Sequence, residues 1–225
     1  YFCVVTEMKK IKLIIPPKNL MVQSNWGDPV FYHYYPYSRT VYRKRLKNTL
    51  ELLQPLRFEN LIEIGYGSGI FLPTISKLAK KVTALDIHKE LDPVRRLLDW
   101  YQISNVDLVS GDIMKMPFED SSFDGCVIVS TLEDIHNSER AVSEIKRIIK
   151  PGGNIIISFP VKNIITDLFF KLVGEDPEEI HPSDHRYILK FLGKNFNVKQ
   201  VLKMPRFAPL DLSLYVSVHC INKKS

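Results

Sequence analysis

Short apolar segments alternate with amphipathic segments from residue 60 onward, and this alternation constrains the fold more than any other feature of the sequence. The apolar segments are rich in β-branched residues and too short for helices, so we expect them to be buried strands. These strands are expected at residues 61–64, 81–87, 106–109, 124–130 and 154–159. Helices are expected between them, at residues 71–79, 94–101 and 141–149. Strands that alternate with helices are typical of a parallel sheet covered on both faces. The sequence therefore predicts an α/β fold with a doubly wound sheet.

The two ends of the chain carry further predicted elements. A helix is expected after Ser38, which stands at the capping position. Its apolar stripe consists of Tyr42, Leu46, Leu50 and Leu53 at helical spacing. After residue 160, helices are expected at residues 164–173 and 187–194, and strands at residues 196–204 and 214–222.

No repeat, low-complexity segment or linker marks a second domain, so we predict one domain over residues 1–225. Its expected parts are an N-terminal helical cap (1–59), a central core (60–160), a lid-like insertion with a helix (161–195) and C-terminal strands (196–225).

The net charge of +6 is concentrated in the N-terminal quarter of the chain. Residues 1–59 contain ten Lys and Arg against four Asp and Glu, whereas residues 60–225 contain 21 of each kind. A protein that coats nucleic acid would be basic over most of its surface, so the sequence disfavours that class. The excess of basic residues in this part indicates either a local patch that faces an anion or a solvated helix face. Arg39, Arg43 and Lys47 lie together on such a helix face.

Hydropathy and the number and spacing of the cysteines indicate the cellular compartment. The chain has 45% hydrophobic and 25% charged residues, which are ordinary globular values. No apolar run approaches the ~18 residues of a membrane-spanning helix, and no targeting segment is evident. Three widely separated cysteines, Cys3, Cys126 and Cys220, make neither a disulfide framework nor a zinc site. We therefore expect a cytoplasmic protein without a transmembrane segment or a metal site.

A glycine-rich turn, Gly65–Gly69, follows the first expected strand and precedes the first helix. Glycines here permit positive φ and close approach of a ligand, and in a doubly wound sheet such a turn binds nucleotide-like ligands. The spacing is G-x-G-x-G, with Glu63 two residues before the first glycine. The dinucleotide fingerprint would need glycine at position 70, where the chain has Ile70. The turn therefore disfavours NAD.

The segment Leu61–Gly69 resembles motif I of the class I S-adenosylmethionine-dependent methyltransferases, and in particular their small-molecule, type 11-like branch. Other segments resemble further motifs in the family's order: Asp86, Gly111–Ile113, Pro117–Phe118, Ser122–Asp124 and Ile149–Gly153. Together these matches span roughly residues 60–160. The resemblance implies a Rossmann-like sheet of seven strands, mostly parallel with an antiparallel last strand, and S-adenosyl-L-methionine as the cofactor.

The same resemblance suggests the cofactor contacts. Asp86 is expected on the ribose hydroxyls, for which an ionised carboxylate is a natural acceptor. Asp112 is expected near the adenine amino group, and Glu63 is expected to serve the methionine part through the glycine turn. The full expected set is Glu63, Gly65, Tyr66, Gly67, Gly69, Asp86, Ile87, Asp112, Ile113 and Ser130.

The acceptor side is less clearly defined. The segment Ser130–His136 lacks the Asn/Asp-Pro-Pro-Tyr/Phe sequence of the family's branches that methylate planar nitrogen. Methyl transfer mainly requires a positioned nucleophile, and it requires a base only where the acceptor must lose a proton. The candidate catalytic residues are Glu133, His136 and His181, and the candidate substrate residues are Tyr35, Arg39 and His185. Packing and helix capping are the competing roles for these side chains.

We therefore predict methyl transfer from S-adenosylmethionine to a small molecule, a lipid headgroup or a sugar, with O-methylation slightly favoured. Residues 31–47 and 164–185 are expected to form a lid over the site. Two alternatives stay open. One is a tRNA or rRNA methyltransferase that uses the basic N-terminal helix, although nucleic acid is the less favoured partner, and the other is a non-catalytic cofactor-binding protein.

Overall fold

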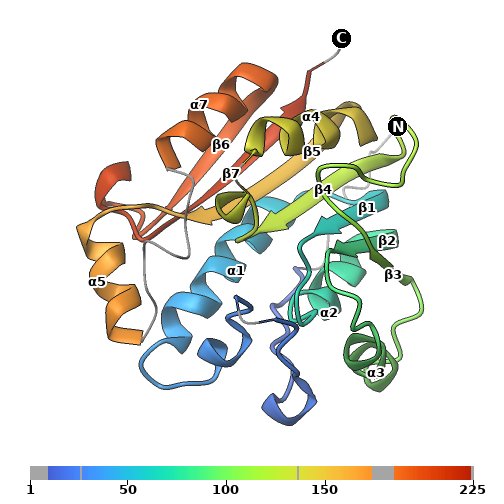
Figure 1. Cartoon of the computed structure of the whole chain (residues 1–225), viewed down its shortest axis with the longest axis horizontal. Coiled ribbons are helices and arrows are strands. Elements are labelled where there is room, and N and C mark those ends of the chain that lie inside the picture. Colours follow the sequence, from blue (N-terminus) through green and yellow to red (C-terminus); the bar gives the residue numbers. More distant parts are fainter. Residues whose placement is uncertain (1–9, 26, 136, 174–184, 224–225) are drawn as a thin grey trace, which may run out of the picture.

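A single sheet of seven strands forms the centre of the computed structural model, which describes residues 10–25, 27–135, 137–173 and 185–223 (Figure 1). The strand order is β3-β2-β1-β4-β5-β7-β6. The strands are β1 (Phe58–Ile64), β2 (Ala79–Asp86), β3 (Val106–Ser110), β4 (Phe123–Val129), β5 (Ile149–Pro160), β6 (Phe196–Met204) and β7 (Tyr215–Asn222). All neighbouring strands pair in parallel except for β7, which is antiparallel to both β5 and β6. The predicted sheet, with its antiparallel last strand, is confirmed.

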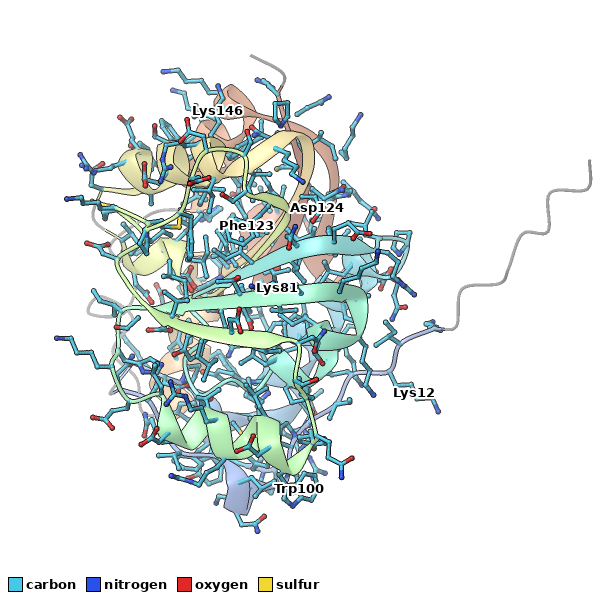
Figure 2. The ribbon with its side chains drawn as sticks, turned by 90° about the vertical axis from the view of Figure 1, so that its right-hand side faces the viewer. Lys12, Lys81, Trp100, Phe123, Asp124 and Lys146 are labelled. Carbon is cyan, nitrogen blue, oxygen red and sulfur yellow. The ribbon has the colours of Figure 1, made fainter. Side chains whose placement is uncertain are left out.

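The order of the strands creates a crevice at one edge of the sheet. From β1 the chain passes outward to β2 and β3 and then returns to β4, on the other side of β1. Asp124 lies at the start of β4 (Figure 2) and accepts hydrogen bonds of 2.9 Å from the backbone N–H groups of Glu59 and Asn60. These bonds join the first residues of β4 to the first residues of β1. Where the strand order reverses in this way, ligands bind at the carboxyl ends of the strands.

Helices cover both faces of the sheet, as the alternation of elements predicted. The helices are α1 (Arg39–Leu53), α2 (Leu72–Ile75), α3 (Asp92–Trp100), α4 (Ser138–Ile148), α5 (Ile164–Val173) and α7 (His185–Asn195). Figure 1 shows α4 and α7 on one face and α1, α2 and α3 on the other. Two buried apolar clusters follow this division, one under α4 and α7 and one under α1 to α3. None of the described helices is both long and apolar enough to cross a membrane.

Helix α1 buries the predicted stripe of Tyr42, Leu46, Leu50 and Leu53. A buried hydrogen bond of 2.8 Å between the hydroxyls of Thr49 and Ser158 fastens the helix to β5. The expected capping by Ser38 is wrong, because its hydroxyl donates to the carbonyl of Tyr32 and leaves the helix N-terminus without a side-chain cap.

The predicted helix at residues 71–79 is also wrong in extent. Helix α2 is a single turn followed by the 3₁₀ turn Ser76–Leu78, because β2 already begins at Ala79. The other predicted helices and strands are present, with ends that differ by a few residues. The division of the chain into cap, core, lid and C-terminal strands stays a prediction.

Candidate functional site

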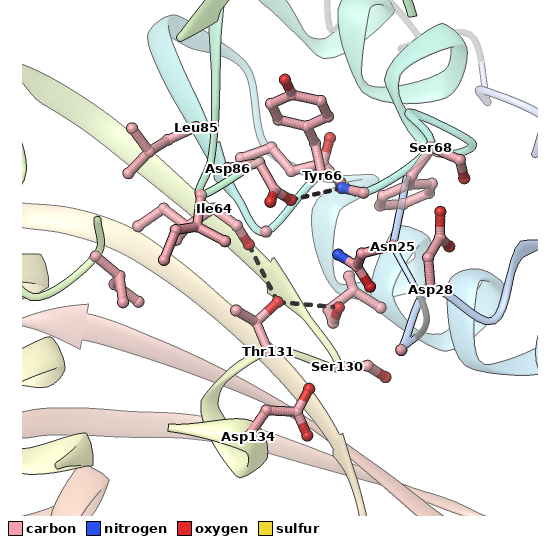
Figure 3. A pocket seen from close by; sticks show the side chains of 18 of the residues that line it. Asn25, Asp28, Ile64, Tyr66, Ser68, Leu85, Asp86, Ser130, Thr131 and Asp134 are labelled. Carbon is pink, nitrogen blue, oxygen red and sulfur yellow. Dashed lines mark hydrogen bonds between the residues drawn. The ribbon is translucent and has the colours of Figure 1, made fainter. Parts of the chain in front are cut away.

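A cavity of about 260 Å³ lies at the carboxyl ends of the central strands (Figure 3). Its walls come from the glycine turn after β1, the ends of β2, β3 and β4, and the N-terminal loop around Asp28. Its position is the crevice that the strand order creates. We refer to it below as the cofactor cavity.

The glycine turn depends on residues without a side chain. Gly65, Gly67 and Gly69 have φ values of +76°, +52° and +75°. A Cβ atom on Gly65 would lie 2.1 Å from Oγ1 of Thr131, which follows β4 and donates to the carbonyls of Ile64 and Val129 (Figure 3). Both the backbone conformation and this close approach therefore require glycine at position 65.

Asp86 joins the end of β2 to the glycine turn. Its carboxylate accepts hydrogen bonds from the backbone N–H of Gly67, at 2.8 Å, and from that of His88, at 3.2 Å. The His88 ring donates in turn to the carbonyl of Gly67 at 3.0 Å. Asp86 is only 8% exposed and borders the cavity, so its carboxylate is held in a fixed orientation at the place predicted for the ribose acceptor.

Glu63 lies inside β1 and is 3% exposed. Burial, assisted by the charge of Asp86, raises the pKa of its carboxyl to about 8. Its Oε2 atom has no hydrogen-bond partner among the described residues. A buried acceptor of this kind is costly unless a ligand donor satisfies it, so Glu63 fits the positive end of a ligand.

The charge of the cofactor cavity distinguishes between ligands. Acidic side chains at its wall come from five different parts of the chain: Asp28, Glu63, Asp86, Asp112 and Asp134. Arg45 is the only basic side chain among the described lining residues. Such a site repels the two phosphates of a dinucleotide and attracts cations. S-adenosylmethionine carries an ammonium and a sulfonium group, so the residues present fit it.

A second, smaller cavity of about 70 Å³ adjoins the first, and we refer to it as the acceptor cavity. The two cavities share the lining residues Gly27, Pro29, Arg45, Ser130 and Asp134. Apart from Glu133, the rest of the wall is mainly apolar and comes from α1, the end of β5, α5 and the start of β7: Val41, Tyr42, Pro160, Thr166, Phe169, Phe170, Leu214 and Tyr215. A molecule in this space would lie directly beside a ligand of the cofactor cavity.

A chain of polar groups runs along the boundary between the two cavities. Arg45 donates to the hydroxyl of Ser130 at 3.0 Å, and the Ser130 and Tyr215 hydroxyls are 2.7 Å apart. The other end of the guanidinium group reaches Nε2 of His33 at 3.4 Å. Burial and the charge of Arg45 lower the pKa of His33 well below its ordinary value, so this imidazole is neutral and accepts from Arg45.

Glu133 closes the acceptor cavity near these groups and is 1% exposed. Neither carboxyl oxygen has a well-formed hydrogen bond to a described residue. Burial raises the pKa of Glu133 well above its ordinary value, with a further contribution from the neighbouring Asp134. The carboxyl is therefore a stronger base than a solvated one, and it holds its proton to higher pH.

The structure brings most predicted cofactor residues together. Every residue of the predicted set except Gly69 borders the cofactor cavity. Gly69 instead lets the turn pack against α3, since a Cβ atom there would lie 2.7 Å from Val94. Of the predicted catalytic residues, Glu133 borders the acceptor cavity, whereas His136 and His181 lie outside the described residues.

The predicted substrate residues lie away from both cavities. The Tyr35 ring stacks on Tyr37, and Arg39 is exposed at the first turn of α1. His185 is buried at the start of α7 and reaches Asp211 at 3.2 Å. None of the three predicted side chains borders either cavity in the described part of the chain.

Sequence reasoning missed Arg45, Thr131 and Asp28. For Arg45 a signal existed, because it falls between Tyr42 and Thr49 on the inward face of α1, where a charged residue needs a buried partner. For Asp28 no signal existed. Its carboxylate accepts from the backbone N–H groups of Ser24 and Val30 within its own loop, and this loop meets the glycine turn only in the folded chain.

Residues 62–157 match the sequence profile of a family described as "Methyltransferase domain". A demethylmenaquinone methyltransferase of Corynebacterium kroppenstedtii is 27% identical over 146 residues, which cover 59% of this chain and 61% of that protein. A demethylmenaquinone methyltransferase of Staphylococcus aureus is 29% identical over 142 residues, which cover 59% of this chain and 57% of that protein. The chain thus spans about three fifths of the length of these curated relatives.

Solved structures share the fold at low sequence identity. The N-methyltransferase NodS from Bradyrhizobium japonicum, in complex with S-adenosyl-L-homocysteine, has a TM-score of 0.66 at 16% identity, covering 89% of this chain and 94% of that one. The cyclase SpnF has a TM-score of 0.67 at 17% identity, covering 91% of this chain and 87% of that one. Because a methyltransferase and a cyclase share this fold, the likeness establishes the architecture and leaves the reaction to the site.

Proposed function

We propose that the protein is a class I S-adenosylmethionine-dependent methyltransferase that transfers a methyl group to an oxygen atom of a small molecule, starting from the match of residues 62–157 to the methyltransferase domain family. The observation that supports this proposal is the pair of adjoining cavities. One is acidic and lies against a glycine turn, and the other is apolar and shares a wall with it.

The cofactor cavity would hold S-adenosylmethionine, which supplies an electrophilic methyl group when it is bound. Asp86 would accept from the ribose hydroxyls, and Asp112 would lie towards the adenine. Glu63, with its unpaired Oε2 atom, would serve the positive charge of the methionine part. Gly65 and Gly67 would let the ligand lie against the backbone, where a side chain would exclude it.

The acceptor cavity favours a small, mostly apolar acceptor. A sugar or a phosphate-bearing headgroup would leave its polar groups against Val41, Phe169 and Leu214, which cannot satisfy them. Two of the curated relatives are named demethylmenaquinone methyltransferase, and a quinone ring is a small acceptor of this apolar kind. We therefore place a small apolar molecule here, ahead of the lipid headgroup and sugar that the sequence also allowed.

Glu133 would act as the general base. Its ionised carboxylate would take the proton of the acceptor hydroxyl, which leaves an oxygen electron pair free to accept the methyl group. S-adenosylmethionine would supply that methyl group, its sulfur would keep the electrons of the broken S–C bond, and it would leave as S-adenosylhomocysteine. Burial favours the neutral form of Glu133, so proton transfer to this residue is assisted by its surroundings. His136 and His181 remain predictions for the same role.

A second candidate function rests on a basic groove beside α1. Lys10, Lys12, Lys44, Lys47 and Arg206 line this groove. The groove would suit the phosphates of RNA, in line with the tRNA or rRNA alternative.

The buried thiols of Cys126 and Cys220 agree with a cytoplasmic location, which stays a prediction.

Methyl transfer from labelled S-adenosylmethionine into a fractionated extract of the source organism tests the proposal. We expect label in the apolar small-molecule fraction with the unaltered protein and much less label with Asp86→Ala or Glu133→Gln. Label in the RNA fraction would instead support the second candidate. Binding of S-adenosylhomocysteine without transfer to any fraction would support a non-catalytic cofactor-binding protein.

A further inference from the structure

The polar end of the acceptor cavity contains one cation among apolar walls. Arg45 is the only basic side chain that the described residues contribute to this cavity. Its guanidinium plane lies over the Tyr42 ring, with its central carbon 4.6 Å from the ring centre, and its direction is fixed by the bonds to Ser130 and His33. The buried Nε atom of Arg45 has no hydrogen-bond partner among the described residues. A fixed cation with a donor to spare suits an oxygen anion.

The walls beyond this cation are aromatic. The rings of Tyr42 and Phe169 have centroids 6.3 Å apart and are tilted by 40°, and Phe170 lies edge-on to Phe169. Aromatic walls stabilise a flat ring through dispersion and edge-to-face contacts. A saturated polyol would gain neither of these and would lose its hydrogen bonds to water.

From this arrangement we infer that the acceptor is a flat ring compound with an acidic hydroxyl, a phenol or an enol, and that Arg45 selects it by stabilising its oxyanion. The inference rests on the proposed function and names its substrate class. Before proton transfer, Arg45⁺ and Glu133⁻ lie beside a neutral hydroxyl, and the side chain of Asp134 also lines this cavity and takes no part in the transfer. After the proton passes to Glu133, Arg45⁺ and the ring oxyanion lie beside a neutral acid. The net charge is unchanged, and the buried carboxyl becomes neutral.

The space available bears on how the ring enters. An apolar cavity of about 150 Å³ holds benzene, whereas the acceptor cavity measures about 70 Å³. Phe169 and Phe170 on α5 therefore have to shift outward for a ring to enter. On the outer side of α5, Ile164 and Leu172 are 81% and 75% exposed, so no described element packs there to oppose this shift.

The experiment uses 4-nitrophenol, whose ionised form is yellow, with the full chain saturated by S-adenosylhomocysteine. We expect the dye to bind and its pKa to fall by about one unit on binding, which corresponds to ~1.4 kcal/mol of preference for the oxyanion. Nitrobenzene, which has the same ring without the hydroxyl, should bind more weakly. Arg45→Met should abolish both the pKa shift and the preference, whereas Arg45→Lys should retain part of each.

Arg43→Met is the matched control, because Arg43 lies on the same helix and also contacts His33 but does not border the cavity. This variant should keep the full pKa shift. If the dye fails to bind, binds with an unchanged pKa, or keeps its shift in Arg45→Met, the inference is overturned.

Calorimetry of S-adenosylhomocysteine on the same samples separates the two proposals. If the unaltered protein does not bind S-adenosylhomocysteine, the proposed function is contradicted. If it binds S-adenosylhomocysteine but not the dye, only the inferred class of acceptor is contradicted. Thermal melting shows whether Arg45→Met is folded, and Arg45→Lys gives the answer where it is not.

Discussion

The two cavities at the edge of the sheet are built in different ways. The cofactor cavity is made mainly of strand ends, backbone amides and carboxylates, most of which are positioned by the parallel register of β1, β2 and β4. The acceptor cavity is made mainly of side chains on α1, α5 and β7, and Arg45 at its boundary is held in part by Ser130, 85 residues away in the chain. The difference indicates a rigid site for one ligand beside an adaptable site for another.

The same contrast separates what each cavity can recognise. Glu63 and Asp86 present carboxyl oxygens to a cationic ligand, and they stand on the neighbouring strands β1 and β2. Phe169 and Phe170 present an apolar surface, and their positions depend on how α5 packs against the rest of the protein. Damage to the cofactor cavity should therefore weaken cofactor binding, whereas damage to the acceptor cavity should change turnover and leave the cofactor bound.

The largest effect on cofactor affinity is expected for Gly65→Ala. The new Cβ atom would lie 2.1 Å from Thr131 Oγ1, on a residue with φ of +76°, so affinity for S-adenosylhomocysteine should fall by about 100-fold or more, with ~1–2 kcal/mol of added backbone strain. Gly152→Ala is the control, since its φ is +81° but no atom lies within 4 Å of the new Cβ atom. Calorimetry should find normal affinity there. Equal losses in the two variants would mean that strain alone, not crowding of the site, is responsible.

Glu133→Gln should lower turnover by about 10²–10⁴-fold, the range for loss of a general base. Because a base must be ionised, the activity of the unaltered protein should rise with pH through a pKa above the ordinary carboxyl range, and the variant should lack this rise. Affinity for S-adenosylhomocysteine should stay unchanged. Glu139→Gln, on the exposed first turn of α4, is the control. A normal pH profile in Glu133→Gln would remove Glu133 from the mechanism.

Asp86→Ala should weaken the binding of S-adenosylhomocysteine by about 1.5–3 kcal/mol, the usual cost of losing a hydrogen bond to a charged group. Asp107→Ala provides the comparison, because Asp107 is an exposed acid on neighbouring β3 that pairs with Lys81. That variant should bind normally in calorimetry. Unchanged affinity in Asp86→Ala would mean that this carboxylate does not contact the ribose.

The smallest effect concerns the proton on Glu63. Its pKa of about 8 in the free protein means that the carboxyl is mostly protonated at pH 7. If the bound cofactor requires the ionised form, binding releases this proton, and affinity should rise about tenfold from pH 6 to pH 7. Calorimetry in buffers of different ionisation enthalpy measures the released proton. Glu63→Gln should bind without pH dependence, and a pH dependence that survives in this variant would have to come from another group.

Much of the cofactor cavity was predictable because its signals are local. The spacing of Gly65, Gly67 and Gly69 after an apolar strand defines the turn, and Asp86 stands where the next strand ends. Parallel strands bring their carboxyl ends to one edge, so residues at corresponding strand ends meet without further information. The short extent of α2 was missed because the apolar run at residues 71–79 is equally compatible with a helix and with an early start of β2.

The sequence by itself determined the alternating fold, the direction of the last strand through the family resemblance, and the acids and glycines of the cofactor cavity. Only the tertiary structure decided the acceptor cavity. Arg45 and Tyr215 both meet Ser130 across 85 residues of chain, and no periodicity encodes which helix face packs on which strand. Tyr35, Arg39 and His185 were equally plausible substrate residues in the sequence, but the packing of the folded chain places them away from the acceptor cavity. Local conformation follows from neighbouring residues, whereas contacts between distant elements depend on how the whole core packs.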